Sequence, residues 1–119
     1  MKAREILQKI NEALGDSDIA ELQKTYFNIF RTELEKAKFI EKDVWRIKDG
    51  TARPTKAIYE NSGNYTHIVE YNIPEHITYT IKPTIDKIGK EEVFNYDINS
   101  QDVLKTVLKD IIDKFEGRE

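Results

Sequence analysis

Two histidines and a group of tyrosines carry most of the reactive chemistry in this sequence. His67 and His76 are the only histidines among the 119 residues, and an imidazole can serve as a general base or as a metal ligand. A metal site would need both rings together with a carboxylate such as Glu70 or Glu75. In the strand register that best separates apolar from polar residues, the two rings point to opposite sheet faces. No metal site and no cofactor are therefore expected.

Aromatic side chains at alternating positions of the predicted strands suggest a second kind of site, a cup for a small apolar ligand. A buried tyrosine hydroxyl needs a hydrogen-bond partner, and a partly wet cavity between sheet and helix would supply several. His67 could then add weak base catalysis. In the alternative interpretation, the rings fill the core and their hydroxyls reach solvent or backbone carbonyls. The candidate ligand-binding residues are Trp45, Tyr59, Tyr65, His67, Tyr71, Tyr79 and Tyr96.

Other catalytic arrangements are not visible in the sequence. The chain has no cysteine, and its serines, Ser17, Ser62 and Ser100, each adjoin Asp or Asn in a predicted cap or turn. The glycines are scattered singly, so no phosphate-binding loop is formed. Paired carboxylates such as Glu91 and Glu92 lie in charge-balanced stretches, without the desolvation that raises the pKa of a catalytic acid. We predict that the chain is not an enzyme, and no catalytic residue is nominated.

The distribution of charge argues against nucleic acid and membrane as partners. The net charge is −3, and residues 1–43, 44–98 and 99–119 each carry a net charge of −1. Nucleic-acid binding normally leaves a basic stripe, and an anionic membrane attracts a polybasic patch. No run approaches the roughly 20 apolar residues of a membrane span. The sequence predicts one cytoplasmic globular domain over residues 1–119.

Three amphipathic helices are predicted from apolar residues that recur at intervals of three and four. The first covers residues 3–14, and the second runs from about Ile19 to Lys38. Asn99 or Ser100 begins the last, which ends before Gly117. The apolar face of the second helix is wide, so we expect it to be buried on two sides, either inside the monomer or against a partner.

Between the helices the apolar pattern changes to a period of two, which is typical of β-strands. Strands are predicted over residues 44–47, 55–60, 65–71, 77–82 and 93–98. Their short connections favour an antiparallel meander. The fold class is therefore α+β, with two N-terminal helices, a five-stranded meander and a C-terminal helix packed on one sheet face. This order is similar to cystatin-like and helix-grip folds, many of which hold ligands in a cup.

The register between the third and fourth predicted strands decides which side chains share a face. If Tyr71 lies opposite Ile77, the apolar positions of both strands fall on one side, with Ile68 as the one exception, and the threonines fall on the other. With a connection one residue shorter, His67 would lie beside Thr78 and Thr80. The first register separates the residue types better, and Trp45 and Ile47 would extend its apolar face across the sheet.

The wide apolar helix faces lead to the principal functional hypothesis. We expect a small non-enzymatic binding domain that contacts a protein partner or self-associates, as accessory, immunity or mobile-element proteins do. The ligand-binding cup is the alternative. The candidate interface residues are Tyr26, Phe27, Phe30, Leu104, Leu108 and Ile112.

Overall fold

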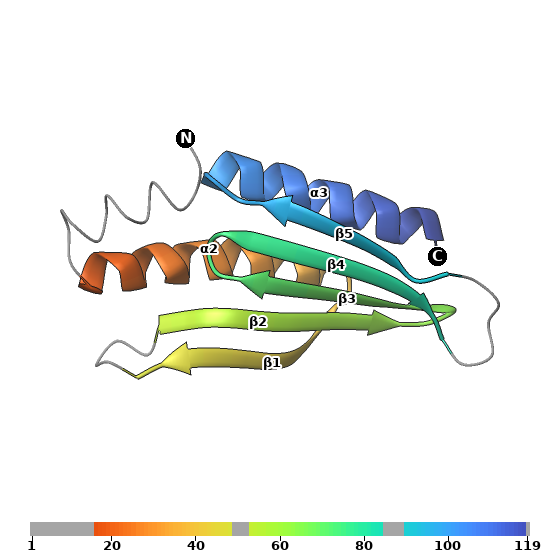
Figure 1. Cartoon of the computed structure of the whole chain (residues 1–119), viewed down its shortest axis with the longest axis horizontal. Coiled ribbons are helices and arrows are strands. Elements are labelled where there is room, and N and C mark those ends of the chain that lie inside the picture. The colour runs from red at the N-terminus through yellow and green to blue at the C-terminus, as the bar shows by residue number, and fades with distance from the viewer. Residues whose placement is uncertain (1–15, 49–52, 85–89, 119) are drawn as a thin grey trace.

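The computed structural model describes residues 16–48, 53–84 and 90–118 as two helices and one antiparallel sheet (Figure 1). The elements follow the chain in the order α2 (Asp16–Lys36), β1 (Ile40–Ile47), β2 (Arg53–Ser62), β3 (Tyr65–Asn72), β4 (His76–Pro83), β5 (Glu92–Asp97) and α3 (Gln101–Arg118). The predicted α+β class, the five strands and the C-terminal helix are confirmed. The helix predicted over residues 3–14 lies outside the described residues.

The sheet is a simple meander in which each strand pairs with the next one along the chain, in the order β1-β2-β3-β4-β5. Tyr71 lies opposite Ile77 and Val69 lies opposite Tyr79, so the predicted register between β3 and β4 is confirmed. The physical reason is that a slip of one residue would turn the buried side chains of a strand, such as Val69 and Tyr71, toward the open face.

Capping interactions explain where α2 ends and where α3 begins. Beyond α2, Lys38 adopts a φ of 72°, and the Phe39 N–H donates to the Leu34 carbonyl at 3.0 Å, as in a left-handed helix terminus. At the start of α3, the Ser100 hydroxyl accepts the Val103 N–H at 3.1 Å, which confirms Ser100 as the N-cap. Gly117 does not end this helix, because α3 continues to Arg118.

One core lies between both helices and one face of the sheet. Phe30 of α2 is fully buried and meets the ring of Tyr59 at 5.3 Å and that of Tyr71 at 4.9 Å. From α3, Phe115 meets the His67 ring at 4.8 Å. The sheet residues of this core occupy alternate positions of β2, β3 and β4, and Figure 1 shows both helices on the same side of the sheet.

The prediction that Trp45 and Ile47 extend the core face is wrong. Trp45 lies opposite Lys56, whereas Val44 lies opposite the buried Ala57, so Trp45 is on the opposite face from the helices. The pairing of β1 with β2 shifts between Glu41 and Asp43 and again between Trp45 and Arg46. Such bulges change which residues of a strand face the core, and alternation within the sequence does not reveal them.

Candidate functional site

The buried tyrosines of the inner sheet face have hydroxyl partners within the chain. Tyr71 donates to the Pro74 carbonyl at 3.0 Å, and Tyr59 donates to Glu41 Oε1 at 3.3 Å. Tyr96, at the far edge of the sheet, donates to Asp110 Oδ2 at 2.7 Å. Three of the candidate hydroxyls therefore bond to the chain itself, as expected if the rings fill the core.

The electrostatic setting of these tyrosines keeps them protonated. Burial raises the pKa of Tyr71 far above its usual range. Burial also raises the pKa of Tyr59, with a further contribution from the Glu41 carboxylate, and raises that of Tyr96, with a further contribution from Asp110. A phenol with a raised pKa donates a hydrogen bond but does not supply a phenolate nucleophile.

His67 is buried completely among aromatic rings. A hydrogen bond of 2.8 Å joins its Nδ1 to the Tyr79 hydroxyl, and the Phe115 ring packs edge-on against the imidazole. Tyr65 lies nearby with a ring separation of 6.5 Å. Since His67 has none of its surface exposed, a substrate would reach it only if the side chains packed around it moved.

Trp45 is the one candidate ligand-binding residue that lies away from this face. Its side chain is 42% exposed on the other side of the sheet, and the Lys56 ammonium lies 4.9 Å from the ring centroid. Tyr59, His67, Tyr71 and Tyr79 do share the inner face, and each is fully buried. The structure thus brings these four together and separates Trp45 from them.

The carboxyl group of Asp110 should make the free energy of unfolding depend on pH. Its hydrogen bonds with Lys114 and Tyr96 lower the pKa of its carboxyl group. A lowered native pKa means that the stabilisation is present above the unfolded value of about 4 and is lost as the pH falls through the native value. Asp110→Asn should therefore lower the free energy of unfolding at pH 7, and the difference from the parent protein should shrink toward pH 2.

Urea titrations at a series of pH values would measure this difference. Asp113→Asn is the matched control, because Asp113 is exposed on the same helix. A difference between Asp110→Asn and the parent that is the same at pH 2 and pH 7 would contradict the prediction.

Most of the candidate interface residues on the helices are buried inside the monomer. Five of the six, Tyr26, Phe27, Phe30, Leu104 and Leu108, have at most 8% of their surface exposed and belong to the core. Of the two explanations offered for the wide face of the second helix, burial within the monomer is therefore the one observed. In the monomer these five side chains are covered by the chain's own sheet and helices.

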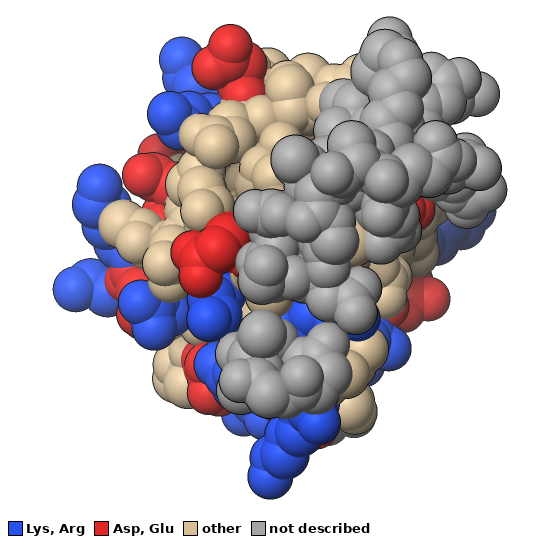
Figure 2. Space-filling view, turned by 90° about the vertical axis from the view of Figure 1, so that its left-hand side faces the viewer, with Lys and Arg blue, Asp and Glu red and all other residues tan. Residues whose placement is uncertain are grey.

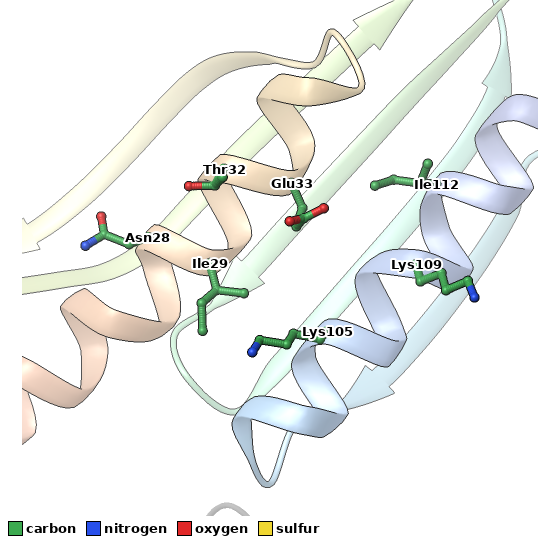
Figure 3. A pocket seen from close by; sticks show the side chains of 7 residues that line it. All are labelled: Asn28, Ile29, Thr32, Glu33, Lys105, Lys109 and Ile112. Carbon is green, nitrogen blue, oxygen red and sulfur yellow. The ribbon is translucent and has the colours of Figure 1, made fainter.

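Ile112, the sixth interface candidate, lines a groove between α2 and α3. The groove has a volume of about 610 Å³, and its lining residues are Asn28, Ile29, Thr32, Glu33, Lys105, Lys109 and Ile112. In Figure 3 Lys105 extends from α3 toward α2, whereas Asn28 and Thr32 point away from α3. None of the candidate ligand-binding residues of the sheet lines this groove.

A different surface, the outer edge of β1, carries most of the exposed apolar side chains. Among the described residues, the large apolar side chains left exposed are Ile40 (64%), Trp45 (42%), Ile47 (44%) and Val93 (51%). The first three lie on β1, and every residue of this strand except Val44 is exposed. Because β1 is the first strand in the sheet order, it pairs on one side only within the described part of the chain.

His76 lies in a polar cluster on the face of the sheet that the helices leave open. Its Nδ1 lies 3.2 Å from Asp97 Oδ1, and its Nε2 lies 3.2 Å from Asn95 Oδ1. Thr78 donates to the same Asn95 oxygen at 3.0 Å. His67 points into the core, so the two histidines lie on opposite faces, as predicted.

Metal-binding clusters and membrane-spanning helices are not found in the part of the chain that the structure describes. There, no group of three or more His, Asp or Glu side chains is arranged to hold a metal ion. Neither α2 nor α3 is long and apolar enough to cross a membrane. Figure 2 shows acidic and basic side chains intermixed among the coloured residues of the face it presents.

Comparison with known proteins does not assign a family. No family model, curated protein or solved structure matches the chain. The arrangement of side chains is therefore the basis for any functional conclusion.

Proposed function

We propose that this chain is a small, non-enzymatic binding domain that acts by contact with a protein, either a different partner or a second copy of itself. The observation that carries the proposal is the concentration of Ile40, Trp45 and Ile47 on the exposed edge strand β1. An apolar group on a strand that pairs on one side offers both side-chain contacts and unpaired backbone groups.

The chemistry of the strand also supports contact with a protein. Recognition of a polypeptide by an edge strand uses main-chain hydrogen bonds for affinity and alternate side chains for specificity. Tryptophan and arginine are enriched at the energetic centres of interfaces, and β1 provides Trp45 and Arg46. A partner of this class would be a polypeptide with an extended segment.

Ile47→Lys tests the proposal. We expect it to weaken association by about tenfold, because a charged ammonium would replace an apolar contact that is 44% exposed in the free chain. Sedimentation velocity of the pure protein would measure self-association, and titration calorimetry would measure the binding of a partner. The free energy of unfolding should change by less than about 0.5 kcal/mol.

Val93→Lys is the matched control, since Val93 is 51% exposed on β5 at the opposite edge of the sheet. Association that responds equally to both substitutions, or to neither, would contradict the assignment of the surface to β1.

The alternative function is a ligand-binding cup with cystatin-like or helix-grip-like layering. Its support is the fully buried His67–Tyr79 pair, which places two hydrogen-bonded polar groups within the core. Native mass spectrometry would separate the two functions. A monomer that carries the additional mass of a small molecule favours the cup, whereas a dimer without such mass favours protein contact.

A further inference from the structure

We infer that the partner of β1 is β1 of a second copy, paired antiparallel about a two-fold axis at Val44 so that two five-stranded sheets become continuous. This inference rests on the proposed function and specifies both the partner and the register. It follows from the availability of the edge, the alternation of side chains along it and the order of its charges.

The free edge of β1 has backbone groups available for pairing. Among residues 16–48, 53–84 and 90–118, β1 forms its ladder with β2 alone. The Val44 N–H donates to the carboxylate of its own neighbour, Asp43, at 3.0 Å. A side-chain acceptor of this kind occupies the position that a strand carbonyl takes in a ladder, and a second strand can replace it.

Contacts within the monomer establish which face each β1 residue occupies. Glu41 accepts the Tyr59 hydroxyl, Val44 packs against the core and Arg46 lies 5.8 Å from the Phe27 ring centroid, so all three lie on the helix side. Ile40 lies opposite Glu60 and Trp45 lies opposite Lys56. These two residues therefore lie on the open side, and Ile47 follows by alternation.

The irregularity between Glu41 and Asp43 makes this strand suited to pairing with itself. In a regular strand, Ile40 and Ile47 would lie on opposite faces because they are an odd number of residues apart. The register shift at Lys42 places Ile40 and Ile47 on the same face of the strand. If Lys42 is the extra residue and is left out of the count, Glu41 and Arg46 each lie two positions from Val44. Ile40 and Ile47 then each lie three positions from it.

Pairing about Val44 then joins complementary side chains. Glu41 of each copy lies opposite Arg46 of the other on the helix side, which forms two symmetry-related ion pairs. Ile40 lies opposite the second copy's Ile47 on the open side, and the two Val44 side chains meet at the axis. Apolar contacts and opposite charges are the cross-strand pairs that stabilise an antiparallel ladder.

Features of β1 also disfavour its pairing with strands other than β1 of a second copy. Lys42 and Asp43 place charges on the edge, and charged residues and bulges are the usual protection against indiscriminate strand pairing. Pairing of β1 with β5 of another copy would leave a free edge at each end and produce open polymers. A two-fold contact between β1 strands closes after two copies.

One strand pair forms a small interface, so we expect a reversible dimer with a dissociation constant in the micromolar range. Sedimentation velocity from about 5 to 500 μM covers the transition. The absence of cysteine from the sequence makes a single introduced thiol an unambiguous reporter of proximity.

Val44→Cys should form a disulfide-linked dimer under mild oxidation. Residues opposite one another in an antiparallel ladder have Cα atoms about 4.5–5.5 Å apart, which lies within the range that a disulfide can span. Val93→Cys, on the opposite edge strand, is the control and should remain monomeric at the same concentration.

Charge exchange tests the register itself. Glu41→Arg and Arg46→Glu should each weaken the homodimer by about tenfold, since both ion pairs become repulsive contacts. An equimolar mixture should form a heterodimer that is bound more tightly than either homodimer, because each of its two 41–46 contacts then joins an arginine of one copy to a glutamate of the other. Urea unfolding of both variants checks that the substitutions leave the fold intact.

The possible outcomes separate this inference from the proposed function. A parental dimer with no disulfide in the Val44→Cys variant and no rescue in the mixture overturns the β1 pairing, while contact through another surface stands. A parental protein that stays monomeric at 500 μM also overturns the pairing. If that monomer in addition carries a bound small molecule and binds no polypeptide, the proposed function fails as well.

Discussion

Phe30→Ala is expected to lower the free energy of unfolding by about 3–5 kcal/mol, the usual cost of removing a buried phenylalanine ring. Phe30 has no exposed surface and lies against the rings of Tyr59 and Tyr71. Small domains unfold with a free energy of about 5–15 kcal/mol, so this one substitution would remove a large part of the stability. Equilibrium unfolding in urea, followed by circular dichroism, would measure it.

Thr32→Ala provides the control on the same helix, because Thr32 is exposed and a surface substitution usually costs less than about 0.5 kcal/mol. A loss of less than about 1 kcal/mol for Phe30→Ala would mean that α2 does not pack against the sheet as described. The two side chains therefore test the position of the helix.

His67→Ala should lower the free energy of unfolding by about 2–4 kcal/mol. The substitution leaves a cavity beside Phe115 and removes the partner of a hydrogen bond with the buried Tyr79 hydroxyl. From the sequence alone, His67 is a candidate for weak base catalysis, and its complete burial adds a role in stability. Thermal and urea unfolding would both report the loss.

His76→Ala is the matched control, since His76 contacts Asp97 and Asn95 on the open face of the sheet. We expect a change of less than about 0.5 kcal/mol there. Equal effects of the two substitutions would contradict the complete burial of His67.

Local patterning was sufficient to predict the inner three strands of the sheet. Tyr71 and Ile77 are opposite one another because this register places the apolar residues of β3 and β4, except Ile68, on the same side. Ser100 was recognised as a possible cap because a hydroxyl directly before an apolar helical pattern satisfies a free N–H. These features depend on residues close together in the sequence.

The edge strand shows where local patterning fails. The run Glu41, Lys42, Asp43 is typical of a loop, and the predicted strand begins only at Val44, whereas β1 begins at Ile40. An edge strand tolerates such charges because it is exposed on both faces. The bulge at Lys42 depends on the pairing with β2, and the residues of β1 by themselves do not predict it.

The sequence pattern also does not predict what the apolar helix faces contact. Phe27, Phe30 and Leu108 form helical stripes that would look the same whether they contacted a sheet or a second protein. In the structure they are buried between the chain's own helices and sheet. The apolar side chains left over for a partner are instead Ile40, Trp45 and Ile47 on β1.

By itself, the sequence determined the α+β class, the five strands, the register of β3 against β4 and the cap of the last helix, because each depends on periodicity or on neighbouring residues. Tertiary structure decided which aromatic residues share the core, why Trp45 is excluded from it and which apolar surface remains exposed. Those outcomes depend on pairing between strands and on the volume filled by helices, which no alternation along a single segment encodes.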